Sequence, residues 1–212
     1  MSRLALERRL ALRAVIGLLA AVTVPARGDD DAPEVTAPIR GFYAVLLNVM
    51  QHAAELRVQG RYDKLAPAIA ATFDLAAMTR IAIGARWSSY APDVQAALVD
   101  GFTRMTIATY AARFDGFSGE RFEVDPIAET RTAGRVVHTR LVKSNGEPIA
   151  LNYLMRAAGS HWKAVDVYLG GTISELATRR SEFSAILDAG GPNALVELLR
   201  QQTDNLMRQV PA

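Results

Sequence analysis

The spacing of apolar residues changes twice along this chain, and these changes constrain the fold more than any single motif. Over much of residues 39–114 apolar side chains recur every three to four positions, the period of an α-helix. After Gly116 they alternate with polar side chains, the period of a half-buried β-strand. The helical period returns after residue 172. Helices before and after a block of strands predict an α+β domain.

The alternating block is expected to hold four strands joined by short turns. Turns are predicted at residues 131–134, at Asn145-Gly146 and at residues 158–160. Asn-Gly favours a two-residue hairpin turn, because both central positions of that turn require a positive φ. Strands with connections this short predict an antiparallel meander. One face of the third strand is expected to carry Ile149, Leu151, Tyr153 and Met155, and one face of the fourth Val165, Val167 and Leu169.

Helices are predicted on both sides of this meander, so that helices from the N-terminal half and two C-terminal helices cover it. Before the strands we expect helices at residues 39–58 (ended by Gly60), 64–71, 75–83 (capped by Asp74 and stopped by Gly84) and 92–114 (opened by Pro92). After the strands, Thr172-Ile173-Ser174-Glu175 is typical of a capping box that opens a helix ending near Asp188. Gly190-Gly191-Pro192 then separates it from a last helix.

The first 26 residues have the organisation of a secretory signal peptide. Arginines at positions 3, 8, 9 and 13 precede an uncharged apolar run from residue 14 to 24, and small residues follow. A run this short does not reach the roughly 20 residues of a membrane span. We therefore expect export to the periplasm, with residues 1–26 as signal peptide, 27–38 as flexible leader and 39–210 as a single domain. A retained N-terminal anchor is the alternative.

Composition argues against several classes of function. The chain has no cysteine, which excludes thiol nucleophiles and thiolate metal ligands. Residues 1–26 carry four Arg and one Glu, so removing their net charge of +3 turns the formal charge of +2 into −1. Such a balance does not favour nucleic-acid binding. Phosphate-loop, dinucleotide and Gly-x-Ser-x-Gly motifs are absent, and the three histidines are not spaced as metal ligands, so neither a metal nor a cofactor is expected.

The segment from Gly159 to Leu187 carries the strongest family signal. A turn with Gly159 and Trp162 is followed by Asp166-Val167, Gly171 and residues 180–183, and the order Phe73-Asp74, Gly84, Trp87, Phe102 and Tyr110 precedes it. This ordered set resembles the MlaC family of periplasmic lipid-binding proteins, also called toluene-tolerance auxiliary proteins. The sequence Tyr168-Leu169-Gly170-Gly171 and the Arg-rich, Lys-poor composition resemble those of the hopanoid-associated HpnM branch of that family.

The resemblance implies a lipid carrier. It would hold the acyl chains of a phospholipid, or a hopanoid-type lipid, and shuttle between an outer-membrane lipoprotein complex and an inner-membrane ABC-transporter complex. Burying one methylene gains about 0.8 kcal/mol, so such a carrier requires an apolar pocket rather than a nucleophile. We expect the pocket to be lined by apolar and aromatic side chains from both helices and strands: Phe42, Leu46, Met78, Phe102, Met105, Tyr110, Leu151, Tyr153, Met155, Val165 and Val167.

Two other functions remain open from the residues alone. Asp166 lies between Val165 and Val167 in a predicted strand, where a carboxylate could act as the general base of a small cone-fold enzyme of isomerase or hydratase type. The same carboxylate could instead face the polar side of the sheet or accept hydrogen bonds from a helix end. The remaining alternative is a periplasmic adaptor that carries nothing and has a filled core.

Overall fold

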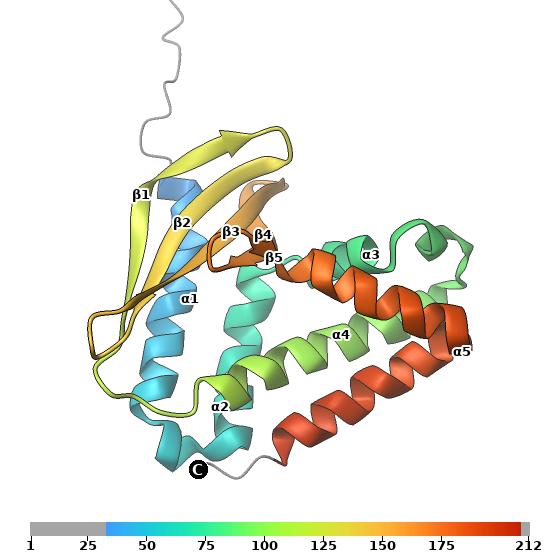
Figure 1. Ribbon diagram of the computed structural model, residues 1–212, viewed down its shortest axis with the longest axis horizontal. Coiled ribbons are helices and arrows are strands. Elements are labelled where there is room, and N and C mark those ends of the chain that lie inside the picture. The colour runs from blue at the N-terminus through green and yellow to red at the C-terminus, as the bar shows by residue number, and fades with distance from the viewer. Residues whose placement is uncertain (1–32, 209–212) are drawn as a thin grey trace, which may run out of the picture.

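The computed structural model describes residues 33–208 and has the predicted α+β class, with one sheet lying across a set of helices (Figure 1). The predicted signal peptide lies outside the described residues. The helices are α1 (Pro33–Gln51), α2 (Ala53–Thr72), α3 (Leu75–Ile83), the 3-10 helix η1 (Gly84–Ser89), α4 (Pro92–Arg113) and α5 (Glu175–Met207). The strands are β1 (Arg121–Arg131), β2 (Gly134–Val142), β3 (Pro148–Ala158), β4 (His161–Leu169) and β5 (Ile173–Ser174). No helix within residues 33–208 is both long enough and apolar enough to cross a membrane.

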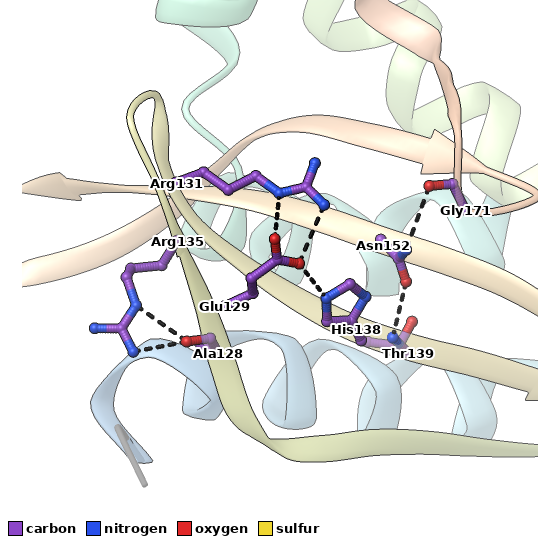
Figure 2. A network of polar contacts seen from close by, with 8 residues as sticks. All are labelled: Ala128, Glu129, Arg131, Arg135, His138, Thr139, Asn152 and Gly171. Atoms are coloured by element: carbon purple, nitrogen blue, oxygen red, sulfur yellow. Dashed lines mark hydrogen bonds and ion pairs between the residues drawn. The ribbon is translucent and has the colours of Figure 1, made fainter. Parts of the chain in front are cut away.

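The sheet is the predicted antiparallel meander, extended by a fifth strand. Its order is β1-β2-β3-β4-β5, and every neighbouring pair is antiparallel. Gly170 and Gly171 both have positive φ angles and turn the chain so that β5 pairs with the end of β4. Asn152 stabilises this turn by donating a hydrogen bond to the Gly171 carbonyl (Figure 2). A strand of two residues has no alternation, so the sequence pattern did not predict it.

The N-terminal helices differ from the prediction at their boundaries. α1 begins at Pro33, inside the segment expected to be a flexible leader, and Val35 is fully buried there. Gly60 does not end a helix; it lies within α2, which also runs through the segment 64–71 that was predicted as separate. The chain instead breaks near His52 and at Arg57, whose φ of 53° and ψ of −179° are not helical.

Arg61 explains why the break falls before Gly60. This side chain is 1% exposed, and its Nη1 donates a hydrogen bond to the Ala53 carbonyl at 2.9 Å. Its Nε donates to the Ala111 carbonyl near the end of α4 at 2.7 Å. Carbonyl oxygens at helix ends lack helical partners and carry partial negative charge. Arg61 therefore joins the α1–α2 corner to the end of α4.

The starts of α3 and α4 agree with the prediction. The Asp74 side chain accepts a hydrogen bond from the Ala77 amide at 2.9 Å, Gly84 ends α3 with a φ of 72°, and Pro92 opens α4. The N-cap of α5 is Ser174 rather than Thr172, because Ser174 accepts the Ala177 amide hydrogen bond at 2.9 Å.

The turn at Asn145-Gly146 is longer than predicted. The Lys143 amide donates to the Glu147 carbonyl and the Gly146 amide to the Lys143 carbonyl, both at 2.9 Å, so residues 144–146 form a three-residue loop. Only Gly146 has a positive φ, at 86°. This is a turn followed by one left-handed residue, the next most common hairpin connection after the two-residue turn.

The two predicted C-terminal helices are the halves of α5. The halves meet at Gly191, whose φ of 71° and ψ of −170° interrupt the helix, and Pro192 begins the second half. In Figure 1 the first half runs away from the sheet and the second half turns back along α4. Gly101 of α4 permits this close packing, because a Cβ atom there would lie 3.3 Å from Leu199.

Candidate ligand-binding cavity

An apolar cavity of about 240 Å³ lies between one face of the sheet and the helices packed against it. Its wall combines residues from α1, α3, α4, the start of α5 and strands β2 to β4. The lining residues are Tyr43, Leu46, Phe73, Met78, Phe102, Met105, Thr106, Thr109, Tyr110, Arg113, Phe114, Leu141, Ile149, Leu151, Tyr153, Val167, Leu169, Glu175, Leu176 and Arg179. Hydrocarbon and aromatic side chains make up most of this set, as in sites that bind apolar ligands.

Most of the residues predicted from the sequence lie in this wall. They are Leu46, Met78, Phe102, Met105, Tyr110, Leu151, Tyr153 and Val167. Phe42 lies outside the lining set and packs edge-to-face against the rings of Phe73 and Tyr110, with centroids 5.4 and 5.3 Å away. Met155 is fully buried in the core and does not line the cavity. These two residues support the wall rather than form it.

Val165 was predicted to share a face with Val167, and this prediction was wrong. Leu154 pairs with Asp166 and Met155 with Ala164, which leaves Val165 as an extra residue in β4. Such a bulge reverses the alternation of side chains along the strand. Val165 therefore packs with Val136 and Leu154 in a small cluster separate from the main core.

Hydrogen-bonded hydroxyl groups form the polar part of the wall. The Tyr43 hydroxyl oxygen lies 2.6 Å from Thr139 Oγ1 and 3.0 Å from the Tyr153 hydroxyl oxygen. Tyr153 is also hydrogen-bonded to Tyr110. Burial raises the pKa of Tyr43 to about 12 and raises the pKa values of Tyr110 and Tyr153 well above their usual range. These phenols are therefore neutral at ordinary pH and join α1, the sheet and α4 around the cavity.

Three charged residues line the cavity, all near helix ends. We call Arg113, Glu175 and Arg179 the charged rim. Arg113 lies in the last turn of α4 and is exposed, whereas Glu175 opens α5 and Arg179 follows one turn later. Sequence reasoning missed all three; for Glu175 at a helix start and Arg113 at a helix end, the helix dipole is a sufficient local explanation.

Several apolar lining residues were also missed. Ile149 and Leu169 were assigned to the correct strand faces by alternation but were not selected as candidates. Phe114 was placed by periodicity on the apolar face of the helix predicted at residues 92–114, and Phe73 directly before the helix predicted at residues 75–83, but neither was selected as a candidate. Phe114 stacks on Tyr110 with ring centroids 5.7 Å apart. Strand parity was thus a usable signal for Ile149 and Leu169, and helix periodicity was a usable signal for Phe114.

Asp166 is engaged at a helix end rather than in the cavity. It is 7% exposed, and its Oδ2 accepts a hydrogen bond from the Ser174 hydroxyl at 2.6 Å. Its Oδ1 accepts hydrogen bonds from the amides of Val167 at 2.8 Å and Leu176 at 3.1 Å. It is not among the lining residues. Asp166 therefore ties β4 to the start of α5, as the helix-end alternative anticipated.

The opposite face of the sheet carries exposed ion pairs (Figure 2). Glu129 of β1 accepts hydrogen bonds from Arg131 Nε at 2.8 Å and from His138 Nε2 at 2.8 Å. Arg131, with a smaller contribution from His138, lowers the pKa of Glu129 to about 2. Within residues 33–208, no group of three or more His, Cys, Asp or Glu side chains is placed to hold a metal ion.

Comparison with known proteins agrees with the geometry. The family model described as MlaC protein matches residues 43–201. A solved phospholipid-binding protein from Ralstonia solanacearum, in complex with a phospholipid, has the same fold, with a TM-score of 0.72 and 24% sequence identity. The alignment covers 82% of this chain and 99% of that one. A search of curated proteins found no match.

Proposed function

The chain belongs to the MlaC protein family, and from this premise we propose that it is a periplasmic phospholipid carrier. The observation that supports the proposal is the apolar cavity between the sheet and the helices, whose only charged lining residues are those of the charged rim. The bound phospholipid of the Ralstonia protein, which shares this fold, agrees with it.

A lipid carrier requires a pocket that buries acyl chains about as well as the membrane interior does. A 16-carbon chain gains roughly 12 kcal/mol on leaving water, so transfer is rapid only if the carrier offers similar burial. The cavity of about 240 Å³ is slightly smaller than the range of about 300–1,000 Å³ common for ligand sites. Loading of a phospholipid with two acyl chains would therefore require this cavity to widen.

The route of transfer is the finer part of the proposal. We propose that the protein takes lipid from one membrane and delivers it to the other, with an outer-membrane lipoprotein complex and an inner-membrane ABC-transporter complex as partners; family membership supports this proposal. The predicted signal peptide supports export to the periplasm. Hopanoid-type lipid is the alternative cargo.

The first test is lipid extraction from the purified mature protein, followed by mass spectrometry. We expect phospholipid in the wild type and a loss of about tenfold or more in Leu151→Glu, because that charge would be buried in the cavity wall. Ile127→Glu is the matched control, since Ile127 is 51% exposed and lies outside the cavity. A folded wild type without lipid would favour the adaptor function instead.

A second measurement distinguishes lipid transfer between membranes from lipid binding alone. Labelled phospholipid is placed in donor vesicles, and its appearance in acceptor vesicles is followed with and without the protein. A carrier accelerates transfer in proportion to its concentration. Binding without transfer would contradict the shuttle.

A further inference from the structure

The charged rim contains both signs of charge, and two of its members have no protein partner. Within the described residues, neither Arg113 nor Glu175 forms a hydrogen bond or ion pair through its side chain, although both line the cavity. Arg179 Nη1 pairs with Glu182 Oε2 at 2.9 Å and also lines the cavity. The Glu175 carboxylate and the Arg113 guanidinium group, both unpaired within the described residues, are therefore available to bind charged groups of a ligand.

The position of Glu175 makes its lack of a partner informative. Glu175 and Arg179 are four residues apart on α5, with the acid on the N-terminal side, which is the favoured arrangement for an ion pair along a helix. Arg179 pairs with Glu182 instead, at an exposed fraction of 21%. The helix dipole explains a carboxylate in the first turn, but it does not explain why that carboxylate lines the cavity.

Both unpaired charges influence Tyr110, which lines the same cavity. Burial is the main cause of its raised pKa, and Glu175 raises this pKa further while Arg113 lowers it. Both charges therefore act on the same hydroxyl group, which itself lines the cavity. Glu175 lies at the start of α5, and Arg113 lies on α4 three residues after Tyr110.

We propose that the charged rim binds a zwitterionic phospholipid head group, with the phosphate near Arg113 and Arg179 and the ammonium group near Glu175. This inference rests on the proposed carrier function and names its preferred cargo: phosphatidylethanolamine rather than phosphatidylglycerol. A rim of cations alone would favour the anionic lipid. Glu175 reverses that preference, because its carboxylate attracts the ammonium group and repels additional negative charge.

The test uses delipidated full mature protein and vesicles containing equal amounts of phosphatidylethanolamine and phosphatidylglycerol with identical acyl chains. The protein is separated from the vesicles, and the ratio of the two bound lipids is measured by mass spectrometry. Exposed ion pairs are modest in strength, so we expect about threefold to fivefold enrichment of phosphatidylethanolamine. Glu175→Gln should abolish this enrichment and shift the ratio towards phosphatidylglycerol, because Arg113 and Arg179 are then the remaining charges of the rim.

Two further variants locate the effect. Glu197→Gln removes a carboxylate from the second half of α5, outside the cavity, and should leave the enrichment unchanged. Arg113→Gln should reduce loading of both phospholipids by a similar factor, because the phosphate is common to them. Wild type in about 1 M salt, where the screening length is roughly 3 Å, should lose most of the enrichment. That measurement does not depend on whether a variant folds.

The outcomes separate this inference from the carrier function. Wild-type protein that loads both lipids without enrichment would overturn the zwitterion preference and leave the carrier intact. Enrichment that persists in Glu175→Gln would also overturn it, because the carboxylate would then have no role. Protein that loads no lipid would contradict the carrier function itself.

Discussion

At the scale of single residues, two arginines decide how the chain leaves α1. Arg61 is buried and forms no ion pair within residues 33–208, and burial lowers its pKa. Its hydrogen bonds to the Ala53 and Ala111 carbonyls offset the cost of removing a charge from water. Arg57 is exposed but has a backbone conformation that is essentially restricted to glycine. The strain at Arg57 thus accompanies the corner that Arg61 stabilises.

Arg57→Gly should therefore increase stability. Relief of the strain is worth about 1–3 kcal/mol, and the greater flexibility of glycine in the unfolded chain costs about 0.5–1 kcal/mol, so we expect a net gain of about 1 kcal/mol. Arg57→Ala is the control, because alanine removes the side chain and keeps the strain. Urea unfolding monitored by circular dichroism measures both. Equal stability of the glycine and alanine variants would show that the backbone is unstrained.

At the scale of elements, α5 performs two tasks with its two halves. The first half contributes Glu175, Leu176 and Arg179 to the cavity, and the second half packs on α4, which forms the opposite wall. The break at Gly191 lets α5 contact both the cavity and α4.

Replacing Gly191 at the break and Gly41 in α1 by alanine should have opposite effects on stability. Gly191→Ala forces a positive φ on a residue with a Cβ atom and should lower the free energy of unfolding by about 1–3 kcal/mol. Gly41 lies in α1, is exposed, and a Cβ atom there would meet nothing within 4 Å. Gly41→Ala should therefore raise the free energy of unfolding by about 0.5–1 kcal/mol. Chemical denaturation of both variants tests the contrast, and a stabilising Gly191→Ala would rule out the break.

At the scale of the whole molecule, the buried tyrosines couple stability to alkaline pH. Tyr43 has a pKa of about 12 in the folded protein and about 10 in an unfolded chain. Below pH 10 the phenol is neutral in both states, and its contribution to stability is complete. Between pH 10 and 12 only the unfolded state releases the proton, so stability falls as pH rises. Tyr110 and Tyr153 act in the same direction.

We expect the free energy of unfolding to fall by about 1.4 kcal/mol per pH unit for each such tyrosine above pH 10. Tyr43→Phe removes one of these phenols and should therefore reduce the slope by about 1.4 kcal/mol per pH unit, whatever its effect on stability at pH 7. Tyr90→Phe, outside the hydroxyl network, is the control. Urea titrations at intervals from pH 9 to 12 provide the slopes. An unchanged slope in Tyr43→Phe would mean that this phenol ionises as readily in the folded state as in the unfolded chain.

Local sequence patterns were enough to predict the α+β class, the meander and the capping of α3 by Asp74, because period and capping depend on residues close in the chain. They also selected most of the apolar lining residues, since strand parity and helix periodicity assign faces. The family signal lay in an ordered set of residues that local physics does not require. Period, strand parity and capping are local patterns that can be interpreted without coordinates, whereas the family signal extends from Phe73 to Leu187.

Tertiary structure decided the features that depend on residues far apart in the sequence. Arg61 sets the α1–α2 corner because it meets Ala111, fifty positions later, and Val165 leaves the cavity face because β4 bulges against β3. The charged rim exists only because the end of α4 meets the start of α5 at one cavity. Local patterns do not contain these encounters, since the identity of a distant neighbour is set by packing rather than by spacing.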